Sequence, residues 1–417
     1  MMNLLKNRPE VWATLPGTAS TPTIPSCFTD EKAMRHLLPL LGYVRDRNYE
    51  GPDLFDGLNS LLFKSTPLYK SRLFRLALIQ FCKKSPVNFR RLFFTPGGFN
   101  PKGGALFLMG HLNLLRHTGG EVYSNDAYLL YQRLKRLQIK RSQGISWGYN
   151  FDWQARAFFV AQGEPNLVTS VYVGRAMLAY HAQMHDPEAL QLALGVAEFI
   201  LGEMVKFENS KFICFNYIPG KDAEVHNANL LGAAYLAQTL EYQPPALQDE
   251  IRQKILKAVR FSLLDINEDG SWPYGTMPFH RWVDNFHTAF NIESLIAVTA
   301  HLQTDEFIPA IKQVTDYYLN HLFTKDGLPQ YFNNKLYPID VHVLAEAIVL
   351  LQLLRQQGLI WDSARVEVIE KALLNLTEQF QDRQGFFYYQ KTARSWNRIP
   401  YIRWGQAWMF YALSSCL

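Results

Sequence analysis

The sequence predicts an all-α protein whose helices alternate between the inner and outer layers of a closed ring of six helical hairpins, an (α/α)6 toroid. Three observations predict this fold. A unit recurs along the chain at about 58 residues, and each unit opens with a short aromatic stretch followed by helical patterns. The two helices of a unit differ, one being apolar on nearly all faces and the other on one face. An apolar share of 48% is ample for a large core.

Residues 1–56 are expected to form an irregular N-terminal extension with one short helix. Four prolines, Pro9, Pro16, Pro22 and Pro25, interrupt the first half, and a helical pattern appears near residues 30–44. Residues 57–417 are expected to form a single toroid domain. Helical patterns near 71–83, 104–117 and 125–141 open this domain, and a helical pair from the region supplies its first hairpin.

Five repeat units follow. Each begins with a glycine or phenylalanine turn and an extended aromatic piece. These pieces are GISWGYNFDW at Gly144, KFICFNYIPG at Lys211, DGSWPYG at Asp269, DGLPQYF at Asp326 and QGFFYYQ at Gln384. After each comes an apolar inner helix such as HTAFNIESLIAVTAHL, and more polar outer helices such as PALQDEIRQKILKAVRFSLL lie between the inner ones. The chain stops on an inner helix near 404–417, so the first hairpin is expected to cover it and close the ring.

With this repeat and segments such as SWPYG…DNFHT, residues 57–417 resemble the six-hairpin glycosidase-like superfamily. Its members include unsaturated glucuronyl hydrolases, several glycoside hydrolases, sugar 2-epimerases, and helical domains of polysaccharide lyases and uronyl epimerases. WGYNFDWQAR also resembles an uncharacterised bacterial group associated with polysaccharide biosynthesis. No catalytic signature of a characterised family matches residue by residue. The resemblance therefore implies a carbohydrate substrate and leaves the reaction open.

Polar residues gather where each inner helix begins, and in a toroid these junctions open at one end around one pocket. Histidines lie at matching positions near three successive helix starts, and aspartates recur near three. We expect the catalytic residues among Asp152, His226, Asp284, His287, Asp340 and His342. Paired imidazoles can exchange protons at a sugar carbon, and two carboxyl groups can hydrolyse a glycosidic bond. The alternatives are core histidines and aspartates that only cap helices.

Aromatic and basic side chains at the same junctions are candidates for substrate binding. Aromatic faces stack on sugar C–H groups, and arginines can clamp a uronate carboxylate or a phosphate with two hydrogen bonds. The expected binding residues are Trp147, Tyr149, Arg156, Asn229, Trp272, Arg281, Trp282, Tyr331, Arg403 and Trp404.

Positive charge is concentrated in the N-terminal third. No Asp or Glu occurs from Gly57 to Gly120, and the formal net charge of the whole chain is +5. The basic region 64–141 is either a solvated face or a surface that docks to an anionic membrane or a lipid-linked glycan. No recognised nucleic-acid module accompanies the charge, so no nucleic acid partner is expected.

The four cysteines are scattered, without CxxC or Cys-His spacing, and no HExxH motif is present. We therefore expect no metal and no cofactor. Scattered cysteines, an N-terminus without a signal-peptide pattern and the lack of a long apolar run predict a cytoplasmic protein, either free or peripheral to the membrane.

These residues favour an enzyme that acts on a poly- or oligosaccharide, including one that contains uronate, in polysaccharide biosynthesis or processing. Hydrolysis, elimination and epimerisation through Asp and His all fit. Another class stays open, a non-catalytic glycan-binding or scaffold protein of a polysaccharide assembly system. A terpene cyclase-like toroid shares the turn in NEDGSWPYG, but the chain has neither its DxDD acid nor a zinc set.

Overall fold

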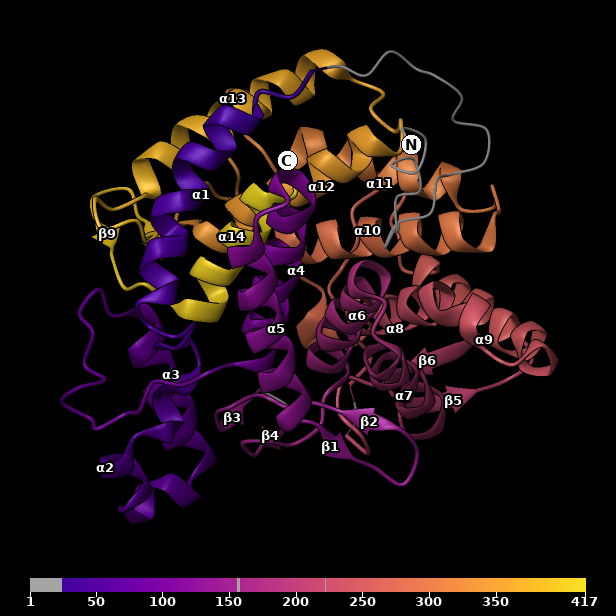
Figure 1. Cartoon of the computed structure of the whole chain (residues 1–417), viewed down its shortest axis with the longest axis horizontal. Coiled ribbons are helices and arrows are strands. Elements are labelled where there is room, and N and C mark those ends of the chain that lie inside the picture. The colour runs from indigo at the N-terminus through magenta and orange to yellow at the C-terminus, as the bar shows by residue number, and fades with distance from the viewer. Residues whose placement is uncertain (1–24, 156–157, 222) are drawn as a thin grey trace.

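The computed structural model describes residues 25–155, 158–221 and 223–417. Residues 1–24 of the expected irregular extension and the candidate Arg156 lie outside these residues. Two concentric layers of helices form a ring, which confirms the (α/α)6 toroid (Figure 1). The inner helices are α4 (Pro101–Thr118), α6 (Leu167–Met184), α8 (His226–Thr239), α10 (Asn285–Leu302), α12 (Val341–Gln356) and α14 (Trp408–Ser414). The outer helices are α1 (Asp30–Arg45), α5 (Glu121–Arg136), α7 (Pro187–Glu203), α9 (Pro245–Leu263), α11 (Ile308–His321) and α13 (Ser363–Phe380).

The two layers differ in burial as their sequences predict. Every residue of α8 is buried, because neighbouring inner helices cover its sides and α9 covers its back. In α9 the buried residues follow one stripe, Ile251, Ile255, Ala258, Val259 and Ser262, and the other face meets solvent. No helix among the described residues is both long and apolar enough to span a membrane.

Helix α1 closes the ring. It packs against α14, and Leu37, Leu40 and Val44 on its inner face are fully buried. The sequence places this helix in an N-terminal extension, whereas in the structure it is the outer partner of the last inner helix. The ring therefore consists of α1 and the inner and outer helices from α4 onward.

The turn glycines of four repeats show that α1 is equivalent to the other outer helices. Gly144, Gly270, Gly327 and Gly385 all have positive φ angles, of 78°, 86°, 81° and 94°. A Cβ atom on any of them would collide with backbone of a different outer helix, namely α7, α11, α13 and α1 in that order. Only glycine fits both the left-handed backbone and the close approach.

Short strands and turns connect the helices at one end of the ring. The antiparallel pairs are β1 (Ile139–Lys140) with β2 (Ile145–Ser146), β3 (Trp153–Gln154) with β4 (Phe159–Val160), and β5 (Val205–Glu208) with β6 (Ile213–Phe215). A three-stranded sheet has the order β7 (Ile339–Asp340), β8 (Gln390–Lys391), β9 (Trp396–Asn397). Single 3-10 turns occur at η3 (Leu240–Tyr242) and η4 (Pro278–His280), and the π-helical turn η5 (Ile402–Ala407) leads into α14.

One segment belongs to neither layer. It comprises η1 (Asp56–Asn59), α2 (Leu61–Lys64), η2 (Pro67–Lys70) and α3 (Arg72–Lys84). In Figure 1 α2 and α3 lie at the lower left edge of the molecule, outside the ring. Helix α3 contacts η1 and β3, so this segment sits beside the junction end of the toroid.

Candidate functional site

A repeated hydrogen bond links each junction to the next and defines the mouth of the toroid. The first residue of an inner helix donates its backbone N–H to the carbonyl oxygen of a tyrosine in the following aromatic stretch. The pairs are Leu167 to Tyr217, His226 to Tyr274, Asn285 to Tyr331 and Val341 to Tyr389, at 3.0–3.1 Å. We call the end of the ring that carries these junctions the mouth.

This hydrogen bond defines which positions of the repeats are equivalent. The three histidines do not lie at equivalent positions. His226 is equivalent to Asn285 and Val341, the first residues of α10 and α12. His342 comes one position later in its helix and His287 two positions later. Each step along a helix turns the side chain by about 100°, so the three imidazoles point in different directions. Asp284 and Asp340, in contrast, are equivalent, because each is the residue before its helix.

Asp284 and His287 form a hydrogen-bonded pair at the start of α10. One oxygen of Asp284, Oδ1, accepts the backbone N–H of His287 at 2.9 Å and caps the helix. The other, Oδ2, accepts Nδ1–H of the His287 ring at 2.7 Å and Nε1–H of Trp282 at 3.1 Å. The carboxylate thereby fixes the ring, and Nε2 of His287 has no hydrogen-bond partner in the described part of the chain. Asp284 is buried, whereas the side chain of His287 is 20% exposed.

Aromatic rings surround the imidazole of His287. The ring of Tyr274 lies 4.4 Å from it, centroid to centroid, and Trp282 stacks on Tyr274 at 4.7 Å. On another side Phe286 lies 4.1 Å from His287 and also contacts Tyr331 at 5.5 Å. Tyr274, Trp282 and Tyr331 are all partly exposed. Their exposed surfaces offer the flat faces that sugar rings stack on.

A second group lies beyond Phe286. Asp340 caps α12 by accepting the N–H of His342 at 2.8 Å, and it also accepts Nε1–H of Trp404 at 2.9 Å and Nε2–H of Gln390 at 2.7 Å. Burial raises the pKa of Asp340 to about 6, although these three donors oppose the rise. His342 stacks on Trp404 at 4.3 Å and lies 4.9 Å from Phe286. Burial and the nearby Lys102 hold its pKa well below the usual range, so this imidazole is neutral.

A lysine that sequence reasoning did not single out also reaches the mouth. Lys83, near the end of α3, places its ammonium nitrogen 5.4 Å from the centre of the Phe55 ring. Burial lowers the pKa of Lys83, and the negative charges of Asp340 and Asp284 oppose that change. Lys83 therefore lies within electrostatic reach of both carboxylates. The sequence feature that could have identified Lys83 is its position in α3, next to Ile79 and Cys82 on the buried side of the helix.

Several expected site residues face away from the mouth. In His226, Nε2 lies 2.8 Å from Asp265 and Nδ1 lies 3.2 Å from Ser262, both at the end of α9. Asn229 donates to the Ala258 carbonyl at 2.8 Å and to Ser262 at 2.9 Å. These two side chains therefore tie the inner helix α8 to its outer partner.

Trp272 and Arg281 also lie at this contact between α8 and the end of α9. Trp272 is buried beside His226, 6.2 Å between centroids, and Arg281 pairs with Asp265 at 2.9 Å on the surface. Trp147 is fully buried elsewhere and donates its Nε1–H to the Leu134 carbonyl at 2.8 Å.

Arg403 is close to the mouth, but its charge is already paired. Its Nε and Nη2 both lie 2.7 Å from the carboxylate of Asp53, and both residues are buried. The guanidinium also lies 5.3 Å from the ring centre of Tyr149. Asp53 occupies the two N–H groups with which Arg403 would bind another anion. The guanidinium instead packs against the ring of Tyr149.

The extended segment 149–153 lies between the mouth and a cavity lined in part by Asn150. Tyr149 and Trp153 face the mouth, where the Tyr149 hydroxyl lies 3.0 Å from that of Tyr217 and the Trp153 ring lies 6.0 Å from the Tyr217 ring. Asp152 faces the other way and bonds Lys64 and the Tyr69 hydroxyl, each at 2.7 Å. Burial would raise the pKa of Asp152, but hydrogen bonds from Lys64, the Gln162 backbone and Tyr69 hold it below the usual value.

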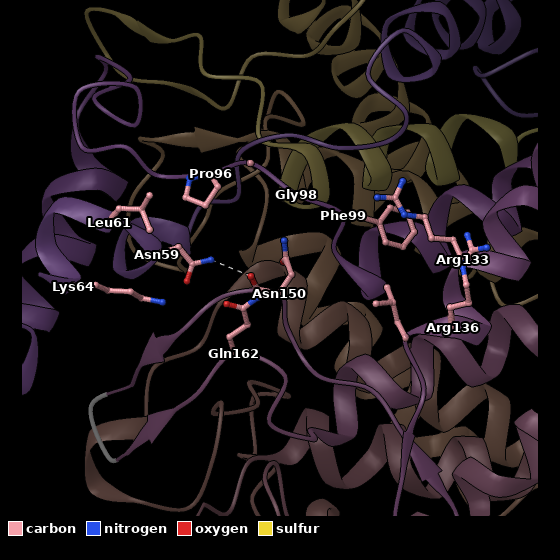
Figure 2. Close-up of a pocket in the computed structure, with 12 residues that line it drawn as sticks. Asn59, Leu61, Lys64, Pro96, Gly98, Phe99, Arg133, Arg136, Asn150 and Gln162 are labelled. Atoms are coloured by element: carbon pink, nitrogen blue, oxygen red, sulfur yellow. Dashed lines mark hydrogen bonds between the residues drawn. The ribbon is translucent and has the colours of Figure 1, made fainter.

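This cavity has a volume of about 560 Å³ and a basic, amide-rich lining. Figure 2 shows Lys64 on one side, Arg133 and Arg136 on the other, and Asn59, Asn150 and Gln162 between them. Asn59 donates to the Asn150 carbonyl at 3.0 Å. Lys64 and Arg133 pair with Asp152 and Glu50. The cavity is therefore polar and weakly cationic, and it adjoins the mouth across the 149–153 segment.

The ring also encloses a buried layer of ionisable side chains. The Nζ atom of Lys102 lies 4.1 Å from the ring centre of Tyr172, 5.1 Å from Trp408 and 5.3 Å from Phe290. Burial and the charge of Arg403 lower its pKa to about 7. Burial also raises the pKa values of Glu293 and Glu346 in the same layer, and the charge of Glu293 raises that of Glu346 further.

No protein-family model matches the chain, and no curated protein matches it either. Solved structures do match. Cellobiose 2-epimerase from Bacillus thermoamylovorans aligns with a TM-score of 0.58 at 13% identity, over 76% of this chain and 87% of that one. Unsaturated glucuronyl hydrolase from Bacillus sp. GL1 aligns with a TM-score of 0.56 at 14% identity, over 93% and 96%.

A GH76 alpha-mannanase from Bacteroides thetaiotaomicron aligns with a TM-score of 0.55 at 10% identity, over 75% of this chain and 85% of that one. All three have the six-hairpin (α/α)6 toroid fold of the six-hairpin glycosidase superfamily. The chain thus has the fold that its sequence repeat predicts. At these identities the likeness extends to the fold alone.

Proposed function

We propose that the protein is a carbohydrate-active enzyme that moves a proton at a sugar carbon, with His287 as the acid–base residue. One observation carries this proposal. The buried carboxylate of Asp284 holds Nδ1 of His287 at 2.7 Å, and the partly exposed ring stands among aromatic faces at the mouth. The solved structures that share the fold include a cellobiose 2-epimerase, an unsaturated glucuronyl hydrolase and an alpha-mannanase.

The arrangement of the carboxylates favours proton transfer over hydrolysis. A glycosidase needs two carboxyl groups free to meet the glycosidic oxygen and the anomeric carbon or a water. Both oxygens of Asp284 already accept hydrogen bonds from His287 and Trp282. Asp340 accepts three and is buried. An imidazole oriented by a carboxylate can instead accept or donate a proton at Nε2 near neutral pH, which suits elimination or epimerisation.

Lys83 supports a uronate as the substrate. Removing a proton next to a carboxylate builds negative charge on that carboxylate, and a nearby cation stabilises it. Lys83 is a cation whose charge interacts with those of Asp284 and Asp340. In this proposal the uronate carboxylate lies under Lys83, His287 removes the adjacent proton, and Trp282 and Tyr331 hold the sugar ring.

The basic cavity beside the mouth would take the acidic group of a neighbouring residue in the glycan, with Arg136 as a contact. We place the activity in polysaccharide biosynthesis or processing, on the resemblance of WGYNFDWQAR. The four cysteines are free, which supports a reducing compartment such as the cytoplasm.

Solvent exchange tests the proposal directly. The protein is incubated in D2O with a panel of oligosaccharides containing glucuronate, galacturonate or mannuronate and with matched neutral oligosaccharides. Proton NMR follows deuterium entry at the carbon next to the carboxylate, and ultraviolet absorbance follows unsaturated products. We expect deuterium entry or an unsaturated product with a uronate only. New reducing ends without deuterium entry would identify a hydrolase, and binding without any reaction would identify a glycan-binding protein.

A further inference from the structure

The surface of residues 61–94, which we call the projection, is unusually apolar. Nearly half of the exposed large apolar side chains that the structure describes lie in this short segment. Leu73 is 72% exposed, Leu92 64% and Leu61 62%. A contiguous exposed apolar surface on a soluble domain marks a site of interaction with another protein, a ligand or a membrane.

Helix α3 presents this apolar surface as a continuous stripe. Leu73, Ala77 and Phe81 follow one another at helical spacing and are all exposed, and Phe74 lies beside them. The opposite side, with Ile79 and Cys82, is buried against the protein. A helix that covers a core normally turns polar residues to solvent, whereas α3 is apolar on both sides.

The loop after α3 extends the stripe. The ring of Phe81 lies 5.3 Å from that of Phe89 and 6.1 Å from that of Phe93. Val87, Leu92 and Phe94 are exposed around this aromatic cluster. Helix and loop therefore present one apolar surface and not a scatter of single residues.

The charge around this surface has one sign. Lys70, Lys84 and Arg91 are exposed, and none pairs with an acidic side chain among the described residues. No Asp or Glu occurs anywhere between Gly57 and Gly120. A second copy of this chain would bring the same unpaired cations against each other. An anionic partner that also accepts apolar side chains fits better.

We propose that the projection docks the protein on the surface of a bilayer that contains anionic lipids. The side chains of Leu73, Phe74 and Leu92 enter the boundary between head groups and acyl chains, and Lys70, Lys84 and Arg91 lie among the lipid phosphates. Apolar burial and attraction to anionic lipid together give stable peripheral binding where either alone is weak. Because Lys83 of the same helix reaches the mouth, docking places the mouth beside the bilayer.

Flotation with lipid vesicles tests the docking. The full chain is mixed with vesicles of phosphatidylcholine alone and with vesicles of phosphatidylcholine and phosphatidylglycerol, at about 0.1 M and about 1 M salt. We expect the protein to float with the anionic vesicles, and a smaller fraction of it to float at high salt. With neutral vesicles the protein should not float. The measurement needs no enzymatic turnover, so the proposed function and the docking can fail separately.

Two variants and two matched controls locate the surface. The charge variant replaces Lys70, Lys84 and Arg91 by Glu, and its control replaces the exposed Lys211, Lys312 and Lys325 by Glu, with the same change in net charge. We expect the charge variant to bind anionic vesicles on the order of 100-fold more weakly than wild type, since each cation contributes roughly fivefold. The apolar variant combines Leu73→Ser with Leu92→Ser, and its control combines Leu129→Ser with Leu264→Ser, residues of similar exposure.

The docking proposal is overturned if either control weakens binding as much as its variant, or if neutral vesicles bind as well as anionic ones. It is also overturned if wild type is a dimer by analytical ultracentrifugation and Leu73→Ser makes it a monomer, because the surface is then an interface between two copies. If the charge variant loses binding and the apolar variant binds fully, the apolar side chains do not enter the bilayer. The contact between protein and lipid is then purely electrostatic, and the proposed insertion is overturned. Circular dichroism melts of all four variants check that each is folded.

Discussion

At the scale of single residues, the direction of each histidine follows from its position within the first turn of its helix. His226 is the first residue of α8 and points to the end of α9, where Asp265 and Ser262 bind it. His287 comes two positions later in the register of the repeats and points into the mouth. The two histidines therefore have different surroundings, although each lies in the first turn of an inner helix.

Replacing each histidine by alanine separates these roles. His287→Ala should reduce deuterium exchange by at least about 10²-fold, since the acid–base group is lost. Its unfolding free energy should fall by less than that of His226→Ala, because Asp284 keeps the hydrogen bonds from Trp282 and from the backbone N–H at position 287. His226→Ala should keep the exchange activity and lose about 1–3 kcal/mol of unfolding free energy, because Asp265 and Ser262 lose a buried partner. Exchange assays and urea titrations of both variants check this. Full exchange activity in His287→Ala contradicts its assignment as the acid–base residue.

At the scale of elements, the start of α12 makes stability depend on pH. Burial raises the pKa of Asp340 from its ordinary value of 3.8 to about 6, so the folded state binds this proton more tightly than the unfolded state. The stability from this group is fully present at low pH and is lost as the pH rises through about 6. The loss amounts to at most about 3 kcal/mol.

Asp340→Asn removes this titration and keeps a cap oxygen. The unfolding free energy of the variant minus that of wild type should rise by up to about 3 kcal/mol between about pH 4 and pH 8. Urea titrations at several pH values measure this difference. A difference that is constant with pH contradicts the raised pKa of Asp340.

The turns that open the repeats have a structural role, and substitutions at two glycines test this. Gly327 and Gly220 both have positive φ angles, of 81° and 67°. A Cβ at Gly327 would lie 2.6 Å from the Val368 carbonyl oxygen of α13, whereas a Cβ at Gly220 would meet nothing within 4 Å.

Gly220→Ala should therefore cost about 1–2 kcal/mol from backbone strain alone. Gly327→Ala should cost clearly more, because α13 must also move. Urea titrations compare the two variants, and both should keep exchange activity in the native state. Equal costs would show that the contact between turn and outer helix is unimportant.

At the scale of the whole molecule, ring closure by α1 predicts one cooperative unit. Leu40 in α1 and Leu373 in α13 are both fully buried leucines of outer helices. Leu40→Ala and Leu373→Ala should each cost about 2–5 kcal/mol in a single transition. Calorimetry tests this, since a separate low-temperature transition in Leu40→Ala would mark α1 as an appendage outside the ring domain.

Much of the architecture was predictable because its signals are local in the chain. Apolar periodicity distinguishes inner from outer helices, and the turn glycines mark the repeat, so both are readable without knowing any contact. The junction positions followed from the same repeat, and Asp284, His287, Asp340, His342, Trp282, Tyr331 and Trp404 do meet at the mouth.

The sequence did not predict which of the junction side chains lie at the mouth and which are already paired with other residues. Arg403 looks like an anion clamp in sequence, yet a carboxylate 350 positions away in the chain, that of Asp53, pairs with it. Asp152 looks catalytic, yet Lys64 and Tyr69 bind it on the far side of the 149–153 segment. Lys83 carries no motif, and only the path of α3 beside the ring brings it to the mouth.

The sequence by itself thus determined an all-α ring of alternating helices with a polar mouth, because hydrophobic periodicity and turn chemistry act over a few residues. The tertiary structure alone decided which side of each helix start faces the mouth, which charges are already paired, and that α1 closes the ring. The physical reason is geometric. One residue of offset turns a side chain by about 100°, and partners hundreds of residues apart become neighbours only when the ring closes.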